Sequence, residues 1–279
     1  MTLIDVINIK NNKELLTIEN CHYPLLKSML YGKIEAKIFI DNLTNPTTIF
    51  VIGNNGWCYQ IGSTIDKSIN DWIQSYVVEI IRSDQQPILW FGIPQLQRAG
   101  LEVLDFVEVR DYPRYKFEFD QNKFKQKSLN EIEYEIEEIN MTNIENFTAN
   151  YAEFEVFWSD KKSFLNNGFG FVAILNGEIL GHAASASVND REVEIDLFTN
   201  ENYRGKGISA HLTYKLIEKC NVKNLVPKWD CATSNKASVR LAQKFGFKIV
   251  EEYQFSYIVG KPNQNIILDK AKNRAKEIG

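Results

Sequence analysis

The segment that decides the fold runs from Glu192 to Cys220 and reads EVEIDLFTNENYRGKGISAHLTYKLIEKC. Its first eight residues alternate polar and apolar side chains, which predicts a β-strand, and the stretch from Ile208 has helical periodicity. A turn with two glycines, RGKGIS, separates them at residues 204–209. The first turn of a helix leaves backbone N–H groups without intrahelical partners. A strand that runs through glycines into a helix therefore predicts an anion site, suited to a pyrophosphate.

The residue types in this turn support the same interpretation. Gly205 and Gly207 have no Cβ to obstruct a phosphate and can adopt positive φ. Arg204 and Lys206 add positive charge at the rim. Taken alone, the hexapeptide also fits an ordinary tight turn before a helix, so a second motif has to decide between the two.

That second motif follows the expected strand LVPKWDC at residues 225–231 and has the form N-x-x-S-x-x-L-x-x-K-x-G-F from Asn235 to Phe247. It predicts one helix that ends at a glycine C-cap, Gly246. Together the two motifs resemble the GCN5-related N-acetyltransferases, which carry Arg/Gln-x-x-Gly-x-Gly/Ala after the fourth strand and Asn-x-x-Ala/Ser-x-x-Leu-x-x-Lys-x-Gly-Phe after the fifth. The resemblance covers about residues 134–258, with Ser209 standing where the family usually has Gly or Ala. The run KWDC is similar to a bacterial subgroup with an extra N-terminal domain.

The resemblance implies acetyl-CoA as co-substrate and assigns its contacts. The pantetheine arm would pair with the strand backbone and contact the second motif, and a backbone N–H, that of Phe198, would stabilise the oxyanion of the tetrahedral intermediate. The cofactor-binding residues expected on this basis are Leu197, Phe198 and Thr199 on the strand, Arg204, Gly205, Lys206, Gly207, Ile208 and Ser209 around the pyrophosphate, and Asn235 and Ser238 on the second motif.

Attack on a thioester requires a neutral amine, so a base must remove a proton from the ammonium form. Strand alternation places Glu192, Glu194 and Asp196 on one face of residues 192–199 and the apolar residues on the other. Because this strand leads into the cofactor turn, Glu194 is the first candidate for the base and Asp196 the second. The alternative is a solvated acidic face without a catalytic role.

The family often places a tyrosine directly after the helix leucine, as the acid for the departing thiolate. Here that position is Ala242. A thiol with a pKa near about 8.5 needs little protonation to leave near neutral pH, so the loss of this acid is compatible with turnover. Tyr253, Tyr257 and Cys231 are possible substitutes. The same absence permits a second hypothesis, in which the protein is a non-catalytic acyl-CoA sensor or scaffold.

A chain of 279 residues predicts two compact units. The polar stretch from Asp120 to Glu131 places the boundary near residue 125, which gives an N-terminal α+β domain (1–125) and a catalytic acetyltransferase domain (126–279). The fold class expected is α+β with a mixed sheet. Residues 35–62 predict a β-meander and residues 68–83 a helix, but nothing like R-x-x-G-x-G occurs in this half. We interpret it as a smaller, degenerate copy of the acetyltransferase fold, with acceptor specificity in a cleft between the halves.

Composition excludes several other classes of protein. The net charge of −4 offers no basic surplus for nucleic acid or an anionic membrane, and no signal-like or membrane-spanning run is evident, which indicates a cytoplasmic protein. Four scattered cysteines and three histidines lack metal-ligand spacing, so no metal is expected. The tandem aminoacyl-tRNA-dependent transferases are another resemblance, but the acidic balance favours free coenzyme A. The expected acceptor is a primary amine of a small molecule or peptide; neither its identity nor the oligomeric state follows from the sequence.

Overall fold

The computed structural model describes residues 1–4, 24–62, 66–83, 87–124, 133–151 and 154–261. In these ranges the strands form one mixed sheet of twelve, in the order β1-β2-β3-β4-β5-β12-β6-β11-β10-β9-β8-β7. The strands of the first half are β1 (Thr2–Ile4), β2 (Ala36–Ile40), β3 (Thr48–Gly53), β4 (Trp57–Gly62), β5 (Ile88–Phe91) and β6 (Val107–Phe119), and its helices are α3 (Pro24–Leu30), α4 (Lys67–Ser83) and α5 (Gln95–Glu102).

The second half begins after residue 132. Its strands are β7 (Glu135–Glu138), β8 (Gly170–Leu175), β9 (Glu178–Val188), β10 (Glu192–Thr199), β11 (Val226–Ala232) and β12 (Phe247–Gly260). Its helices are α6 (Ile144–Ala149), α7 (Phe154–Phe157), α8 (Lys161–Asn167), the 3-10 turn η1 (Glu201–Tyr203), α9 (Ile208–Val222) and α10 (Lys236–Lys244). The mixed α/β architecture confirms the fold class expected from the sequence.

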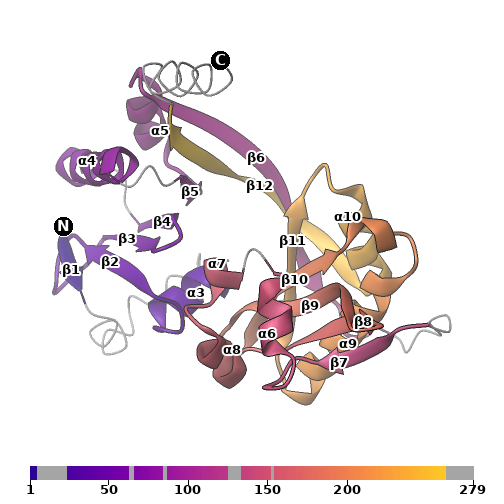
Figure 1. Ribbon diagram of the computed structural model, residues 1–279. Coiled ribbons are helices and arrows are strands. Elements are labelled where there is room, and N and C mark those ends of the chain that lie inside the picture. The colour runs from indigo at the N-terminus through magenta and orange to yellow at the C-terminus, as the bar shows by residue number, and fades with distance from the viewer. Residues whose placement is uncertain (5–23, 63–65, 84–86, 125–132, 152–153, 262–279) are drawn as a thin grey trace, which may run out of the picture.

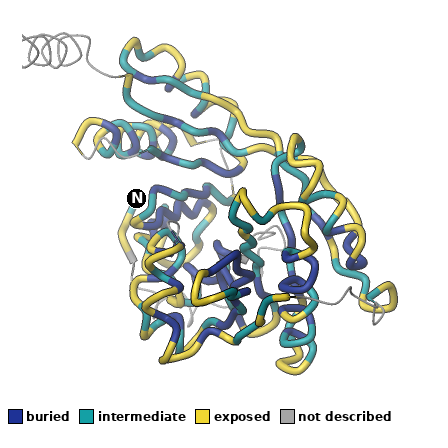
Figure 2. The backbone as a smooth tube through the Cα atoms, turned by 45° about the vertical axis from the view of Figure 1, so that its right-hand side comes forward, coloured by how far each residue is buried: buried dark blue, intermediate teal, exposed yellow. Residues whose placement is uncertain are grey.

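Local sequence explains most of these elements. Residues Ile73, Val77 and Ile81 recur on one face of α4, and each is buried against the sheet. Asn176 and Gly177 join β8 to β9 with φ values of 51° and 81°, the positive pair that a type I′ hairpin needs. Figure 2 shows the buried residues running along the strands of both halves, with turns and outer helix faces exposed.

The two halves repeat one order of elements. Three successive antiparallel strands (β2–β4 and β8–β10) lead through a helix (α4 and α9) to a strand parallel to the third (β5 and β11), and then through another helix to a long last strand (β6 and β12). This order agrees with the degenerate-copy interpretation of the first half, which stays a prediction.

The last strands exchange partners between the halves. β6 pairs with β11 of the second half, β12 pairs with β5 of the first, and β6 and β12 pair with each other from Val107 to Phe119. In Figure 1 these two strands form a long ladder that crosses from one half to the other. β6 is thirteen residues long, from Val107 to Phe119, because its first part follows β12 into the N-terminal half. The boundary predicted near residue 125 falls in the range 125–132, outside the described residues, as does the tail beyond Lys261.

This exchange leads to a prediction about truncation. A chain that begins at residue 126 lacks β6, so β11 and part of β12 lose their partner strand and the cluster around Trp229, Phe245 and Phe247 loses the fully buried Phe117. We expect this fragment to lack the cooperative thermal unfolding of the full chain, as measured by circular dichroism. A sharp transition in the fragment would show that the second half folds without the exchanged strand.

Candidate active site

Strands β10 and β11 are paired only over their first residues. Their parallel pairing covers Glu192 to Glu194 and Val226 to Lys228. Beyond that point β10 continues beside β9 and β11 beside β6, so within the described sheet the two strands diverge. The diverging edges, at Ile195–Thr199 and at residues 229–232, offer backbone groups to an extended ligand inserted between them. The space between these edges, the β10–β11 opening, narrows toward Glu194, the last residue of β10 that pairs with β11.

The predicted phosphate turn lies at the wide end of this opening. Gly205 and Gly207 have φ values of 80° and 83°, which L side chains rarely adopt. A Cβ added at Gly205 would meet nothing within 4 Å, and one at Gly207 would meet only the ring of His211, at 3.8 Å. Gly207 is the N-cap of α9 and supplies no side-chain cap, so the first amides of that helix face an open cradle. These features fit the pyrophosphate of acetyl-CoA.

Side chains tie the turn to the end of β10. The hydroxyls of Thr199 and Ser209 hydrogen-bond at 2.9 Å, and Arg204 Nε donates to the Thr199 carbonyl at 3.2 Å. Ser209, the departure from the usual Gly or Ala, thus links strand and helix. Lys206 Nζ lies 5.0 Å from the ring centre of Tyr203, at the exposed rim.

The second motif borders the β11 side of the opening. Asn235 caps α10 by accepting the backbone N–H of Ser238 at 3.0 Å, and the Ser238 hydroxyl accepts the indole N–H of Trp229 at 3.0 Å. Both side chains therefore have structural partners, and their contacts with pantetheine stay a prediction. Ala242, at the position where the family often has a tyrosine, is fully buried in the cluster with Phe245.

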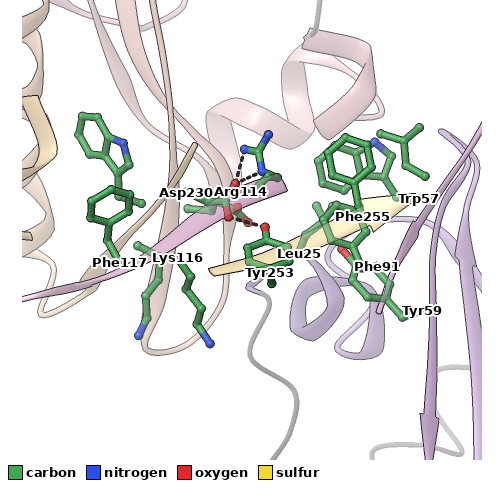
Figure 3. Close-up of a pocket in the computed structure, with 14 residues that line it drawn as sticks. Leu25, Trp57, Tyr59, Phe91, Arg114, Lys116, Phe117, Asp230, Tyr253 and Phe255 are labelled. Carbon is green, nitrogen blue, oxygen red and sulfur yellow. Dashed lines mark hydrogen bonds and ion pairs between the residues drawn. The ribbon is translucent and has the colours of Figure 1, made fainter. Parts of the chain in front are cut away.

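A cavity of about 260 Å³ begins where the opening ends. Both halves of the chain line it, which places a cleft where the sequence analysis expected one. Its lining is apolar or aromatic on β4 and β5 and includes charged groups on β6, β10 and β11. The lining residues are Leu25, Trp57, Tyr59, Leu89, Phe91, Arg114, Lys116, Phe117, Glu194, Lys228, Trp229, Asp230, Tyr253 and Phe255 (Figure 3).

Glu194 faces this cavity with an altered acidity. Burial raises the pKa of its carboxyl from the ordinary 4.5 to about 7, and the charge of Asp230 adds to the increase. Arg114 and a hydrogen bond from the backbone N–H of Leu25 act in the opposite direction. Leu25 belongs to the first turn of α3, so a helix of the N-terminal half holds this carboxylate. A carboxyl with a pKa near 7 is suited to exchanging protons at neutral pH.

The other two carboxylates of the β10 face have partners of their own. Glu192 forms ion pairs with Lys27 of α3, at 2.7 Å, and with Lys228, at 3.1 Å. Asp196 Oδ2 lies 3.2 Å from Nε2 of His182, a buried residue of β9 that the sequence analysis assigned no chemistry. Asp196 does not line the cavity, whereas Glu194 does. The geometry therefore favours Glu194 over Asp196 as the base.

Sequence reasoning missed a network beside Glu194. Asp230 on β11 pairs with Arg114 on β6 and accepts the hydroxyl hydrogen of Tyr253 on β12 (Figure 3). Burial raises the pKa of Tyr253, and Asp230 raises it further, so the phenol stays protonated. Of the three substitutes considered for the missing acid, Tyr253 lines the cavity, while Cys231 is buried in a core cluster. A signal was available: Trp229 and Cys231 are apolar, and alternation sends Asp230 to the opposite face.

The network predicts a shift in the pH dependence of activity. Replacing Asp230 with asparagine removes a negative charge that raises the pKa of Glu194 and leaves Arg114, which lowers it. The loss of the Asp230 charge and the unopposed charge of Arg114 both lower the pKa of Glu194. We expect the acidic limb of the kcat/KM profile to move below pH 7 in Asp230→Asn and to stay in place in Asp71→Asn, an exposed control on α4. A limb at the same pH in both variants would contradict this coupling.

Within the described ranges, no group of three or more His, Cys, Asp or Glu side chains is arranged to hold a metal ion. Among the helices described, none has both the length and the apolar character needed to span a bilayer.

Known proteins resemble this chain over nearly all of its length. It is 26% identical over 260 residues to a Bacillus subtilis (strain 168) protein named uncharacterized N-acetyltransferase YdfB, with 92% of this chain and 99% of that protein covered. A GCN5-related N-acetyltransferase-like protein from Streptococcus suis 89/1591 superposes with a TM-score of 0.67 at 21% identity, covering 90% and 98%. A tandem GNAT protein from the clavulanic acid biosynthesis pathway superposes at 0.64 and 9% identity, covering 94% and 98%. These two structures share the fold.

The sequence profile of the GNAT acetyltransferase family also matches most of the chain. It covers residues 15–256, which include the glycine turn, the second motif and the cavity. Enzymes of this family use acetyl-CoA as co-substrate and act on amine acceptors. The resemblance proposed from residues 134–258 is thus confirmed and extends into the N-terminal half. The chain belongs to the GNAT acetyltransferase family and is an acetyltransferase.

Proposed function

We propose that this enzyme transfers an acetyl group from acetyl-CoA to a primary amine of a small molecule or peptide, with Glu194 as the base. One observation carries the proposal: the narrow end of the β10–β11 opening and the cavity meet at Glu194, whose pKa is about 7. A donor that enters from the glycine turn and an amine held in the cavity would approach each other there.

Each part of the donor has a set of residues that fits it. The amides from Gly205 to Ser209, with Arg204 and Lys206 at the rim, would hold the pyrophosphate. The strand edge Leu197–Thr199 would pair with pantetheine, and Asn235 and Ser238 border its path. When bound, acetyl-CoA supplies an activated acetyl carbon. The backbone N–H of Phe198 is the proposed hydrogen-bond donor to the oxygen on that carbon.

The chain's own groups account for the movement of protons. Glu194 accepts one proton from the ammonium form of the acceptor and leaves a neutral nitrogen. That nitrogen forms a bond to the acetyl carbon as the carbon–sulfur bond breaks. The nitrogen then loses a second proton, and the thiolate gains one, so the products are the N-acetyl amine, coenzyme A and one proton released to solvent. Tyr253 is held by Asp230 and stays protonated, which makes it a positioning group rather than the acid.

The test is an acetyl-CoA thiol-release assay on the full-length protein across a panel of primary amines, with mass spectrometry of the products. The expected result is thiol release that depends on the amine and yields a product 42 Da heavier, the mass that an acetyl group adds in place of hydrogen. Tight acetyl-CoA binding without acetylation of any amine would instead support the sensor alternative, which the residue at Ala242 permits.

A further inference from the structure

One wall of the cavity is made of stacked aromatic rings. The ring of Phe91 lies 5.0 Å from those of Trp57 and Tyr59, with interplanar angles of 30° and 21°, and 5.3 Å from that of Phe255. Tyr59 and Phe91 are almost fully buried. Figure 3 shows these four residues, the aromatic wall, gathered on one side of Tyr253. Flat rings in this arrangement favour a flat apolar ligand.

Three of the four wall residues come from the first half of the chain, whereas Phe255 and Glu194 come from the second. Tyr59 on β4 and Phe91 on β5 are the last paired residues of that parallel pair, with Trp57 two positions before Tyr59, and Glu194 occupies the place on β10 that corresponds to Tyr59. The cavity therefore has an apolar end and an end with one proton acceptor. A ligand that satisfies both ends carries an apolar body and an amine.

The charged groups around the cavity disfavour a polycation. Asp230 is neutralised by Arg114, Lys228 pairs with Glu192, and Lys116 pairs with Glu251. Glu194 forms no ion pair with another described residue, and Asp230 is the other carboxylate of the lining. A polyamine or an aminoglycoside would bring several ammonium groups to a site with one available carboxylate, and each unpaired charge would be costly to desolvate.

The volume of the cavity limits the size of the acceptor. About 260 Å³ lies below the roughly 300–1,000 Å³ common for drug-sized ligands. One aromatic ring on a short alkyl chain is of a suitable size, whereas a folded peptide segment is not.

We propose that the acceptor is a small arylalkyl amine, with its ring against the aromatic wall and its nitrogen at Glu194. This assignment rests on the proposed acetyl transfer and narrows its acceptor class. It makes Trp57 and Leu89, in the half of the chain that lacks the phosphate turn, and Phe255 of β12 determinants of specificity.

The experiment compares kcat/KM for 2-phenylethylamine, 1,4-diaminobutane and lysine amide at saturating acetyl-CoA, using the full-length protein. We expect 2-phenylethylamine to be preferred by about 10- to 100-fold, since burial of apolar groups in a pocket discriminates to this extent. Equal or better turnover of either hydrophilic amine would overturn the assignment.

Two substitutions in the cavity lining, one of them in the aromatic wall, test where the ligand binds. Leu89→Phe adds volume inside the cavity and Trp57→Leu removes a ring while keeping an apolar side chain, so both should lower the preference for 2-phenylethylamine over 1,4-diaminobutane several-fold. Leu96→Phe makes the same change as the first on an exposed residue of α5, 56% accessible, and should leave the preference unchanged. An unchanged preference in both Leu89→Phe and Trp57→Leu would contradict the proposed site.

A failure of the proposed function can be told apart from a failure of this inference. If no amine is acetylated, calorimetric titration with 2-phenylethylamine decides whether the cavity binds such amines. Binding that weakens in Leu89→Phe and persists in Leu96→Phe would retain the ligand class for a non-catalytic protein. No heat of binding in the unmodified protein would overturn the inference as well.

Discussion

Replacing Glu194 with glutamine is expected to lower kcat by about 10²- to 10⁴-fold near pH 7, the range that general-base catalysis supplies. The affinity for acetyl-CoA should change little, because the carboxylate faces the cavity rather than the glycine turn. The loss should shrink as pH rises and neutral amine becomes abundant. Steady-state rates from pH 6 to 9, with acetyl-CoA binding measured separately, check these expectations.

Asp196→Asn is the matched control, since Asp196 lies two residues further along the same face of β10 and pairs with His182 instead of lining the cavity. Severe loss in Asp196→Asn with normal turnover in Glu194→Gln would move the base to Asp196. Full activity in both would mean that the enzyme takes up neutral amine from solution.

Glu194→Gln should lower turnover but raise the stability of the fold. Because burial raises the pKa of Glu194 from 4.5 to about 7, folding favours the neutral carboxyl. The stability that this group contributes is complete below pH 4.5 and is lost as pH rises through 7. Glutamine is neutral throughout, so Glu194→Gln should have a higher Tm than the unmodified protein at pH 8 and no such advantage at pH 4.5. Increased stability with reduced turnover would distinguish a functional carboxylate from a solvated one.

Replacing Gly207 with valine is expected to weaken acetyl-CoA binding by at least about tenfold. Valine resists the φ of 83° at this position, at a cost of roughly 1–3 kcal/mol, and its branched side chain would project into the phosphate cradle. Titration calorimetry with acetyl-CoA measures the change.

Gly177→Val provides a control for backbone strain alone. Gly177 has a similar φ of 81° and nothing within 4 Å of an added Cβ, but it lies in the β8–β9 hairpin turn. This variant should lose a similar amount of stability and retain its affinity for acetyl-CoA. If Gly207→Val bound acetyl-CoA as well as the unmodified protein, the pyrophosphate would have to lie elsewhere.

The helix of the N-terminal half that corresponds to α9 has no phosphate cradle at its start. This helix, α4, is preceded by Asp66, whose carboxylate accepts the backbone N–H of Ser68 at 2.8 Å and that of Ile69 at 3.3 Å. An anion of the chain itself thus occupies the amides that Gly207 leaves open on α9. A phosphate there would meet a negative charge in place of a cradle.

Short-range patterns were sufficient for the parts of the site that are contiguous in sequence. The strand, the glycine turn and α9 follow one another along residues 192–222, and the positive φ values of Gly205 and Gly207 follow from the absence of a Cβ. Alternation also assigned the faces of β10, since Val193 is fully buried in the core cluster beside α9 while Glu194 faces α3.

The parts of the site that could not be predicted depend on contacts between residues far apart in the sequence. Arg114 and Asp230 meet because β6 crosses into the second half, and no local pattern records that exchange. The acidity of Glu194 likewise depends on Leu25, nearly 170 positions earlier in the chain. Trp57 and Tyr59 alternate on one strand, which predicts a shared face but not the cavity that this face lines.

The most direct test of the account is a crystal structure of the full-length protein with coenzyme A and 2-phenylethylamine. We expect the pyrophosphate at the amides of residues 205–209, pantetheine between β10 and β11, and the amine nitrogen near the sulfur and within hydrogen-bonding reach of Glu194, about 2.6–3.2 Å. Pantetheine that lies outside the β10–β11 opening, or an amine bound away from Glu194, would contradict it.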